Sequence, residues 1–232
     1  MSANQQALRE SVKRLIVERG LPPGALLPTE LELMRELDVG RNPLREAMKA
    51  LEAQGIVDIR HGYGTYVGGV SLSGLEAGLA FRGALSVRGD LTEIQELLEV
   101  REVLEAGLTG RVLAAGDAVD LEVLESAVQT MEDRARDGEY APEADWLFHE
   151  TLYRPLGNAL VLELLRVFWR VFRSLDDDLP RGEEETPALV ASWHRDILEA
   201  LRARDEPALH TAVEAHFRGI RARVSGSVAR FG

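Results

Sequence analysis

In the first 67 residues, short apolar stripes alternate with residues that end helices. This pattern restricts the fold more than any other feature of the chain. Apolar side chains recur every three or four positions in residues 8–19, 30–37 and 42–54, which predicts three helices. Thr29 and Glu32 form a capping box before the second helix. The chain is therefore expected to begin with a small helical domain.

A β-hairpin is expected directly after the third helix. Residues 56–59 and 65–67 are predicted to be two short strands, and the segment between them contains Gly62 and Gly64, which suit a turn. Two short helices joined by a tight turn and followed by a hairpin describe a winged helix-turn-helix, here assigned to residues 1–68.

The rest of the chain is expected to be helical. Residues 69–90 are predicted to be a linker with a short connecting helix at 75–85, and residues 91–232 an all-α antiparallel helical bundle. Thr92 with Gln95 is a second candidate capping box. The predicted helices of the bundle lie at about residues 92–115, 120–137, 142–155, 158–178, 187–203 and 206–229.

Composition excludes several classes of protein. The chain has no cysteine, which rules out a disulfide framework, and no apolar run near the roughly 20 residues of a membrane span. The polar N-terminus does not resemble a signal peptide, so a cytoplasmic protein with no membrane partner is expected. The net charge of −12 argues against a nucleic-acid binder, but residues 1–70 carry nine basic and nine acidic side chains. The whole acidic excess therefore belongs to the second part, and two domains with different roles are indicated.

The third helix and the hairpin carry the residues that suit DNA. Polar and basic side chains gather where the helix would enter a major groove, and arginine is the usual bidentate partner of guanine. The candidate DNA-binding residues are Arg41, Asn42, Arg45, Lys49, Arg60, His61 and Gly62. A small helical domain with an ordinary solvated arginine face is the alternative.

Three linked motifs in residues 8–67 resemble the GntR family of bacterial transcription regulators. Residues 23–33 resemble its "pG..LPsE.eL" signature, residues 39–47 its "VSR.pvReAl" recognition helix, and residues 51–67 its "L...Glv....g.Gt.V" hairpin. The resemblance implies that Arg41 and Arg45 contact bases and that the wing tip enters the minor groove. The chain departs from the family at Leu31, where many relatives have a DNA-contacting arginine, and at Gly40, a weaker N-cap than the usual serine.

Histidine and aspartate positions in the second part indicate a metal site. Asp145 and His149 are four residues apart, which offsets their side chains by only about 40° around a helix. His194 and His216 also lie beside apolar stripes of predicted helices, whereas His210 is expected to be exposed. Each histidine taken alone suits an ordinary core position, and the four residues together suit a first-row metal.

Arg101 stands inside an apolar helical stripe, where a charge is rarely left without a partner. Glu105, one turn further on, is a candidate partner. The functional alternative is that Arg101 binds the carboxylate of a ligand through a bidentate contact.

Residues 90–225 resemble the FCD effector domain of the FadR-like branch of GntR regulators. Residues 97–105 resemble its "l.e.R..lE" helix, residues 145–149 match "D..FH", and residues 194–205 resemble "H..i..Ai..gD". The resemblance implies that Asp145, His149, His194 and His216 hold a divalent metal ion, often zinc or nickel. It also implies that Arg101 helps to bind a small organic acid.

The function expected from these features is a metabolite-responsive transcription regulator, most simply a repressor and not an enzyme. Its partners would be a palindromic double-stranded DNA operator, a small carboxylate metabolite and a second copy in a homodimer. A metal-dependent enzyme that uses the Asp/His3 site is one alternative. A regulator that binds a long acyl chain is another, which the polar metal constellation disfavours.

Overall fold

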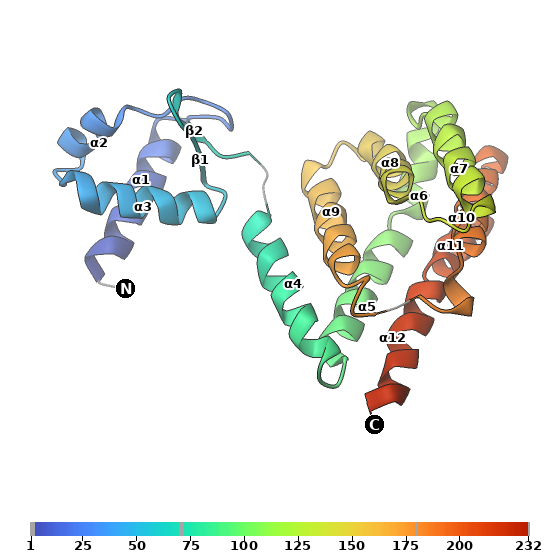
Figure 1. The fold of residues 1–232 in the computed structure, drawn as a ribbon. Coiled ribbons are helices and arrows are strands. Elements are labelled where there is room, and N and C mark those ends of the chain that lie inside the picture. The colour runs from blue at the N-terminus through green and yellow to red at the C-terminus, as the bar shows by residue number, and fades with distance from the viewer. Residues whose placement is uncertain (1–2, 70–71, 180, 232) are drawn as a thin grey trace. The chain divides into compact units, whose positions relative to one another are not determined.

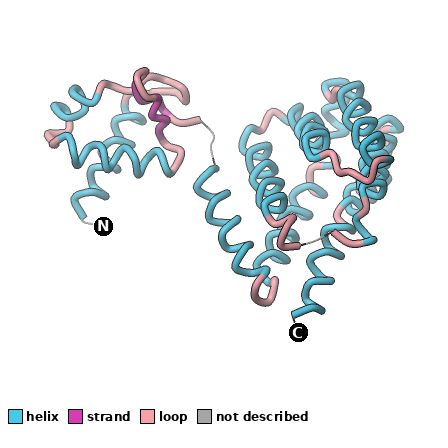
Figure 2. The backbone as a smooth tube through the Cα atoms, in the orientation of Figure 1, coloured by secondary structure: helices cyan, strands magenta, loops and turns pink. Residues whose placement is uncertain are grey.

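The computed structural model describes residues 3–69, 72–179 and 181–231. The chain divides into two compact units, residues 1–77 and 78–232. Helices dominate both units, and the strands among the described residues lie in the first (Figures 1 and 2). None of the described helices is both long and apolar enough to cross a membrane.

The first unit is a winged helix-turn-helix, as the sequence predicts. Its elements are α1 (Ala3–Glu18), α2 (Glu30–Glu36), α3 (Arg41–Ala53), β1 (Val57–Arg60) and β2 (Gly64–Val67). The strands are antiparallel, with Val57 opposite Val67 and Arg60 opposite Gly64. Buried apolar side chains from the helices and the hairpin form one core, which includes Val12, Leu33, Leu44, Leu51 and Val57.

Local signals set the ends of α2 and α3. The capping box of α2 is confirmed, because Thr29 Oγ1 accepts a hydrogen bond from the Glu32 amide and the Glu32 carboxylate accepts one from the Thr29 amide. Gly40 is the N-cap of α3 and offers no side-chain hydrogen bond. In the turn of the hairpin, Gly62 has a φ of 82°, a conformation that glycine adopts without strain.

The second unit is a bundle of helices, as predicted. With the connecting helix α4 (Ser73–Val87), its helices are α5 (Thr92–Ala106), α6 (Thr109–Ala115), α7 (Leu121–Arg136), α8 (Pro142–Tyr153), α9 (Ala159–Ser174), α10 (Pro187–Ala203), α11 (Glu206–His216) and α12 (Arg218–Phe231). The most extensive packing joins α7 to α10, α10 to α11 and α7 to α8. Fully buried side chains such as Ile94, Leu124, Phe148, Leu152 and Ile197 fill the space between them.

Three predictions for this unit were wrong in detail. The helix expected at 92–115 ends at Ala106, and its C-cap is Gly107, a residue of low helical propensity. The helix expected at 206–229 is interrupted at Phe217, whose ring is buried at the break. Thr92 is not an N-cap: Leu91 takes that position with a φ of 62°, and Asp90 accepts the hydrogen bond of the Thr92 amide.

Candidate nucleic-acid interface, metal centre and ligand cavity

The outer face of α3 carries exposed polar and basic residues opposite its buried stripe. Arg41, Asn42, Arg45 and Lys49 are all exposed, while Leu44, Ala47, Met48 and Leu51 point into the core. This division follows from the helical period, because the buried positions recur every three or four residues and leave the other face to solvent. The face has the size and chemistry of a helix that enters a major groove.

The hairpin presents a second exposed surface. His61, Gly62 and Tyr63 lie at its turn and are exposed. Arg60 is also exposed, but its Nε lies 2.8 Å from Asp58 and its guanidinium lies 4.2 Å from the centre of the Tyr66 ring. The Arg60 side chain is therefore already held within the wing before any ligand arrives.

A groove between α3 and the hairpin brings part of the predicted DNA-binding set together. Asn42, Arg45, Lys49 and His61 all line it, whereas Arg41, Arg60 and Gly62 do not. Glu30, at the start of α2, also lines the groove and contacts Arg41 and Arg45, each at 3.2 Å. Sequence reasoning did not single out Glu30, because no local pattern shows which side chains of α3 it meets.

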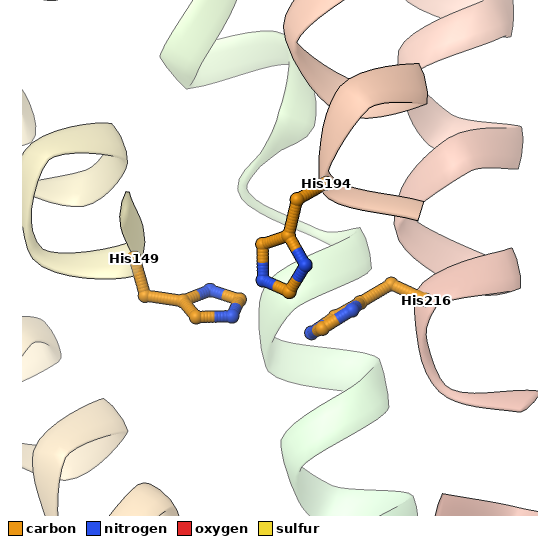
Figure 3. A group of neighbouring side chains, drawn as sticks. All are labelled: His149, His194 and His216. Carbon is orange, nitrogen blue, oxygen red and sulfur yellow. The ribbon is translucent and has the colours of Figure 1, made fainter. Parts of the chain in front are cut away.

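The histidines predicted as metal ligands meet in the interior of the second unit. His149 comes from α8, His194 from α10 and His216 from the end of α11, and Figure 3 shows the three rings turned toward one another. One ring nitrogen of each lies within 4.8 Å of the others. Asp145 Oδ1 lies 3.0 Å from His194 Nε2 and 3.8 Å from His149 Nε2, so all four residues converge. His210 is exposed, as expected.

Unpaired nitrogen atoms show that this cluster suits a cation. Both ring nitrogens of His149, Nε2 of His194 and Nδ1 of His216 are buried and make no hydrogen bond. Buried polar atoms usually have a partner, because leaving them without one costs free energy. His194 Nδ1 donates to the carbonyl of Val190 at 2.7 Å, which leaves the Nε2 lone pair directed at Asp145. A metal ion between the rings would bind one nitrogen of each histidine, and the second nitrogen of His149, Nδ1, lies 3.6 Å from Glu105.

The protonation states of the cluster suit metal binding. Burial lowers the pKa of His149 to about 4, although Glu105 and Asp145 act in the opposite direction. Burial and the other two histidines also lower the pKa of His216 well below its ordinary value. Burial acts to raise the pKa of Asp145, but the close contact with His194 and the other nearby histidines hold it below its usual range. At neutral pH His149 and His216 are thus neutral imidazoles and Asp145 is a carboxylate, which are the forms that bind metals.

The sequence left two roles open for Arg101, an ion pair with Glu105 and a contact with the carboxylate of a ligand. Its Nε lies 2.7 Å from Oε1 of Glu105, so the predicted ion pair exists. Tyr153 donates a hydrogen bond to the other oxygen of Glu105, and the same oxygen lies 3.6 Å from His149 Nδ1. Arg101 also lines the cavity described next, together with His216. The side chain is therefore paired, buried and in contact with a space for a ligand.

A cavity of about 100 Å³ is lined by two of the four candidate metal ligands, Asp145 and His216. Arg101 also lines it, as do Tyr140, Arg181 and Arg223. Its lining also includes the carboxylates of Glu139, Asp176 and Glu185 and the rings of Trp169, Phe172 and Trp193. The space thus suits a small polar molecule better than a long acyl chain.

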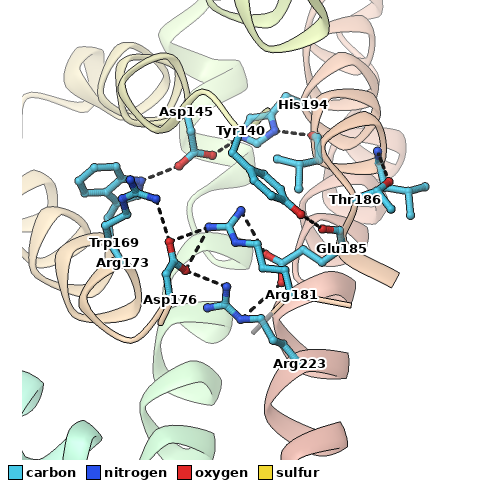
Figure 4. Close-up of polar contacts among 12 residues, drawn as sticks. Tyr140, Asp145, Trp169, Arg173, Asp176, Arg181, Glu185, Thr186, His194 and Arg223 are labelled. Atoms are coloured by element: carbon cyan, nitrogen blue, oxygen red, sulfur yellow. Dashed lines mark hydrogen bonds and ion pairs between the residues drawn. The ribbon is translucent and has the colours of Figure 1, made fainter. Parts of the chain in front are cut away.

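A network of ion pairs fixes the polar wall of this cavity, as Figure 4 shows. Asp176 contacts Arg181 at 3.0 Å and Arg223 at 2.8 Å, and both arginines also approach Glu185. The ring of Tyr140 lies 4.0 Å from the Arg181 guanidinium. Sequence reasoning missed this network because its members come from the end of α9, the loop before α10, and α12.

Trp169 is a further residue that the sequence did not indicate. It lies on α9, and its Nε1 donates a hydrogen bond of 2.5 Å to Asp145 Oδ2 (Figure 4). The other oxygen of Asp145 faces His194 and His149, so Trp169 fixes the orientation of the carboxylate from behind. The only signal in the sequence was a tryptophan on a predicted apolar helix, which equally suits the core.

Comparisons with known proteins agree with both units. Residues 4–67 match the model of "Bacterial regulatory proteins, gntR family", and residues 96–219 match the FCD domain. The Uxu operon transcriptional regulator of Escherichia coli (strain K12) is 28% identical over 94% of this chain and 86% of its own. The galactonate operon transcriptional repressor of the same strain is 25% identical over 85% of this chain and 86% of its own.

A solved structure supports the same assignment. The protein described as Streptococcus agalactiae GntR superposes with a TM-score of 0.63 at 30% identity, over 94% of this chain and 98% of the other. The family and these relatives are transcription regulators, and nothing in them supports the alternative of a metal-dependent enzyme. With a winged helix-turn-helix before a helical effector domain, the chain belongs to the GntR family of bacterial transcription regulators and carries an FCD domain.

Proposed function

We propose that this regulator is a repressor that releases its operator when a small organic acid binds beside a divalent metal ion in the second unit. The observation that carries the proposal is the set of unpaired nitrogens of His149, His194 and His216, which lie next to a cavity lined by Arg101. Asp145 completes a donor set of one carboxylate and three imidazoles, which suits zinc or nickel.

The metal would supply a positive charge and open coordination positions for the carboxylate of the effector. Arg101 lines the same cavity as Asp145 and His216 and would add a charged hydrogen-bond donor toward that carboxylate. The polar wall that contains Arg181, Arg223 and Tyr140 would contact the remainder of the molecule. Two relatives are named for a galactonate operon and the Uxu operon, which is consistent with a metabolite as the signal.

The first unit would bind the operator. We infer that residues 1–68 form the DNA-binding domain, with α3 in the major groove and the hairpin tip in the minor groove. Residues 69–90 would connect it to residues 91–232, which would bind the effector and form a homodimer. A dimer of this kind would recognise a palindromic operator, because the symmetry of the site follows that of the protein.

Effector and operator would affect each other equally. If the acid weakens operator binding, the operator must weaken acid binding by the same factor, because the coupling free energy is shared. Repression follows if the acid-free form is the one that binds DNA tightly.

A thermal-shift screen of small carboxylic acids, with and without chelator, tests the sensor. We expect one acid to raise the melting temperature of the metal-loaded protein, because a ligand that binds only the folded state stabilises it. The shift should disappear after chelation. Stabilisation that survives chelation would contradict the role of the metal, and a screen in which no acid stabilises the protein would contradict the sensor proposal itself.

A further inference from the structure

We propose that Glu30 positions Arg41 and Arg45 for reading bases and thereby sets how well the protein distinguishes its operator from other DNA. The inference rests on the proposed role of α3 in the major groove. It concerns a residue of α2 that acts on bases through the arginines of α3.

The contact joins one carboxylate oxygen to two arginines. Oε1 of Glu30 lies 3.2 Å from Nε of Arg41 and 3.2 Å from Nε of Arg45. The side chain of Glu30 is 36% exposed, but this oxygen is shielded from solvent and has no well-aligned hydrogen bond. The two arginines cover it, while their own side chains are 66% and 63% exposed.

The position of Glu30 is fixed by the structure around it. It is the first residue of α2, directly after Thr29, whose capping box with Glu32 holds the start of the helix. Leu33, one turn further on, is buried in the core. The carboxylate is therefore presented to α3 by a rigid element and not by a loop.

This contact has a geometric consequence for both arginines. Each arginine approaches Glu30 through Nε, and both side chains are mostly exposed, so their terminal nitrogens would be free to turn toward a DNA groove. Those nitrogens form a pair of parallel donors, which is what the O6 and N7 acceptors of guanine require. Restricting the two long side chains before binding also reduces the entropy that is lost on the operator.

The contact also has an electrostatic consequence. Glu30 offsets one of the two positive charges at the start of α3, and binding to DNA of any sequence depends on such charges. Glu30 would thus favour the correct sequence by orienting the two arginines. It would also disfavour other DNA, because it reduces the attraction of the arginines to phosphates.

Three variants of the full chain separate these two effects. Glu30→Gln removes the charge, Glu30→Asp keeps the charge but shortens its reach, and Glu36→Gln is the matched control. Glu36 lies on the same helix, has a similar exposure of 40% and pairs with Arg19 at 2.6 Å, away from α3. Circular-dichroism melting of each variant shows whether the unit is still folded.

Two DNA probes give the readout. One is a single 30-base-pair duplex of scrambled sequence, whose affinity is measured against KCl concentration. The other is a duplex library with a randomised central segment, which is selected on the protein and sequenced. The first measures attraction to DNA of any sequence, and the second measures discrimination between bases.

We expect Glu30→Gln to bind the scrambled duplex about threefold to tenfold more tightly, with a salt slope steeper by about 0.9, the value for one additional phosphate contact. Its selected sequences should show weaker base preferences than those of the unaltered protein. Glu30→Asp should bind the scrambled duplex like the unaltered protein but select with the same weakened preferences. Glu36→Gln should change neither property.

Two results would overturn the inference. One is a Glu30→Asp variant that selects the same sequences with the same preferences as the unaltered protein. The other is a Glu30→Gln variant that behaves like Glu36→Gln with both probes. If the unaltered protein enriches no sequence at all, the proposed operator-binding function fails, and the inference fails with it; this result is distinct from the first two.

Discussion

Each unit contains a carboxylate that contacts two side chains, and the two carboxylates differ in their surroundings. In the first unit Glu30 contacts Arg41 and Arg45, which are mostly exposed. In the second unit Asp145 contacts His194, which is completely buried, and accepts a hydrogen bond from Trp169. The side chains of Glu30 and Asp145 are 36% and 23% exposed, so the contrast lies in their partners, which are exposed arginines in one unit and a buried histidine in the other.

The difference shows how exposure to solvent changes the free energy that such a contact contributes. Exposed ion pairs are worth about 0–1 kcal/mol, because water competes for both charges and salt screens them. Breaking a buried pair costs roughly 3–5 kcal/mol, because the remaining charge has no partner. The contact of Glu30 with its exposed arginines thus contributes little to stability, whereas the groups around Asp145 are held more firmly in place.

The largest effect should follow from removing a histidine of the buried cluster. His194→Ala should lower the affinity for Zn²⁺ or Ni²⁺ by more than about 100-fold, because it removes a proposed ligand whose orientation the Val190 carbonyl fixes. Isothermal titration calorimetry with each metal measures this. The control is His210→Ala, an exposed histidine on α11 that should leave metal affinity unchanged. Equal affinity in the two variants would show that the cluster is not the metal site.

Loss of the Arg101 charge should destabilise the protein strongly. Arg101→Met keeps much of the side-chain volume but leaves Glu105 buried beside Tyr153 and His149 without its closest partner. We expect the free energy of unfolding to fall by about 3 kcal/mol. Urea denaturation measures it. For comparison, Arg82→Met breaks a surface pair with Glu93 and should cost less than about 1 kcal/mol. Similar losses in both variants would mean that burial does not separate the two kinds of pair.

A smaller effect is expected from Trp169, which touches Asp145 but not the histidine cluster directly. Trp169→Phe keeps an aromatic ring and removes the hydrogen bond to Asp145 Oδ2. Partners of this kind typically contribute 10-fold to 100-fold to metal affinity, and we expect a loss in that range. Trp146→Phe is the control, because its ring packs against Trp169 at 5.6 Å on the neighbouring helix. If both variants bind metal equally well, Trp169 only fills space.

The smallest effect is expected on the exposed surface of α2. Leu31 is 52% exposed and carries no charge, although the family often has arginine here. Leu31→Arg should raise the affinity for a scrambled duplex by less than about tenfold and steepen its salt slope by about 0.9. Leu31→Gln, a polar but uncharged variant, should bind like the unaltered protein. An unchanged salt slope in Leu31→Arg would place this face of α2 away from the phosphates.

Much of the secondary structure could be predicted because its signals are local. The capping box of Thr29 with Glu32, the apolar stripe of α3 and the glycine-containing hairpin each involve residues within a few positions of one another. The interruption at Phe217 was not predicted, because no proline marks it and the nearest glycine, Gly219, lies inside α12; the Phe217 side chain is buried at the break. Thr92 met the local rule for a capping box, yet the chain used Asp90 instead.

The sequence by itself determined which chemistry is available: a pair of arginines at the start of a short helix, and Asp145 with His149 on one helical face. Only the tertiary structure decided what surrounds these groups. It places Glu30 against the arginines, Trp169 behind Asp145, and Arg181 and Arg223 around Asp176. The physical reason is the distance along the chain over which each signal acts. Helix period and capping act over about four residues, whereas these contacts join distant segments that only the packing of the core brings together.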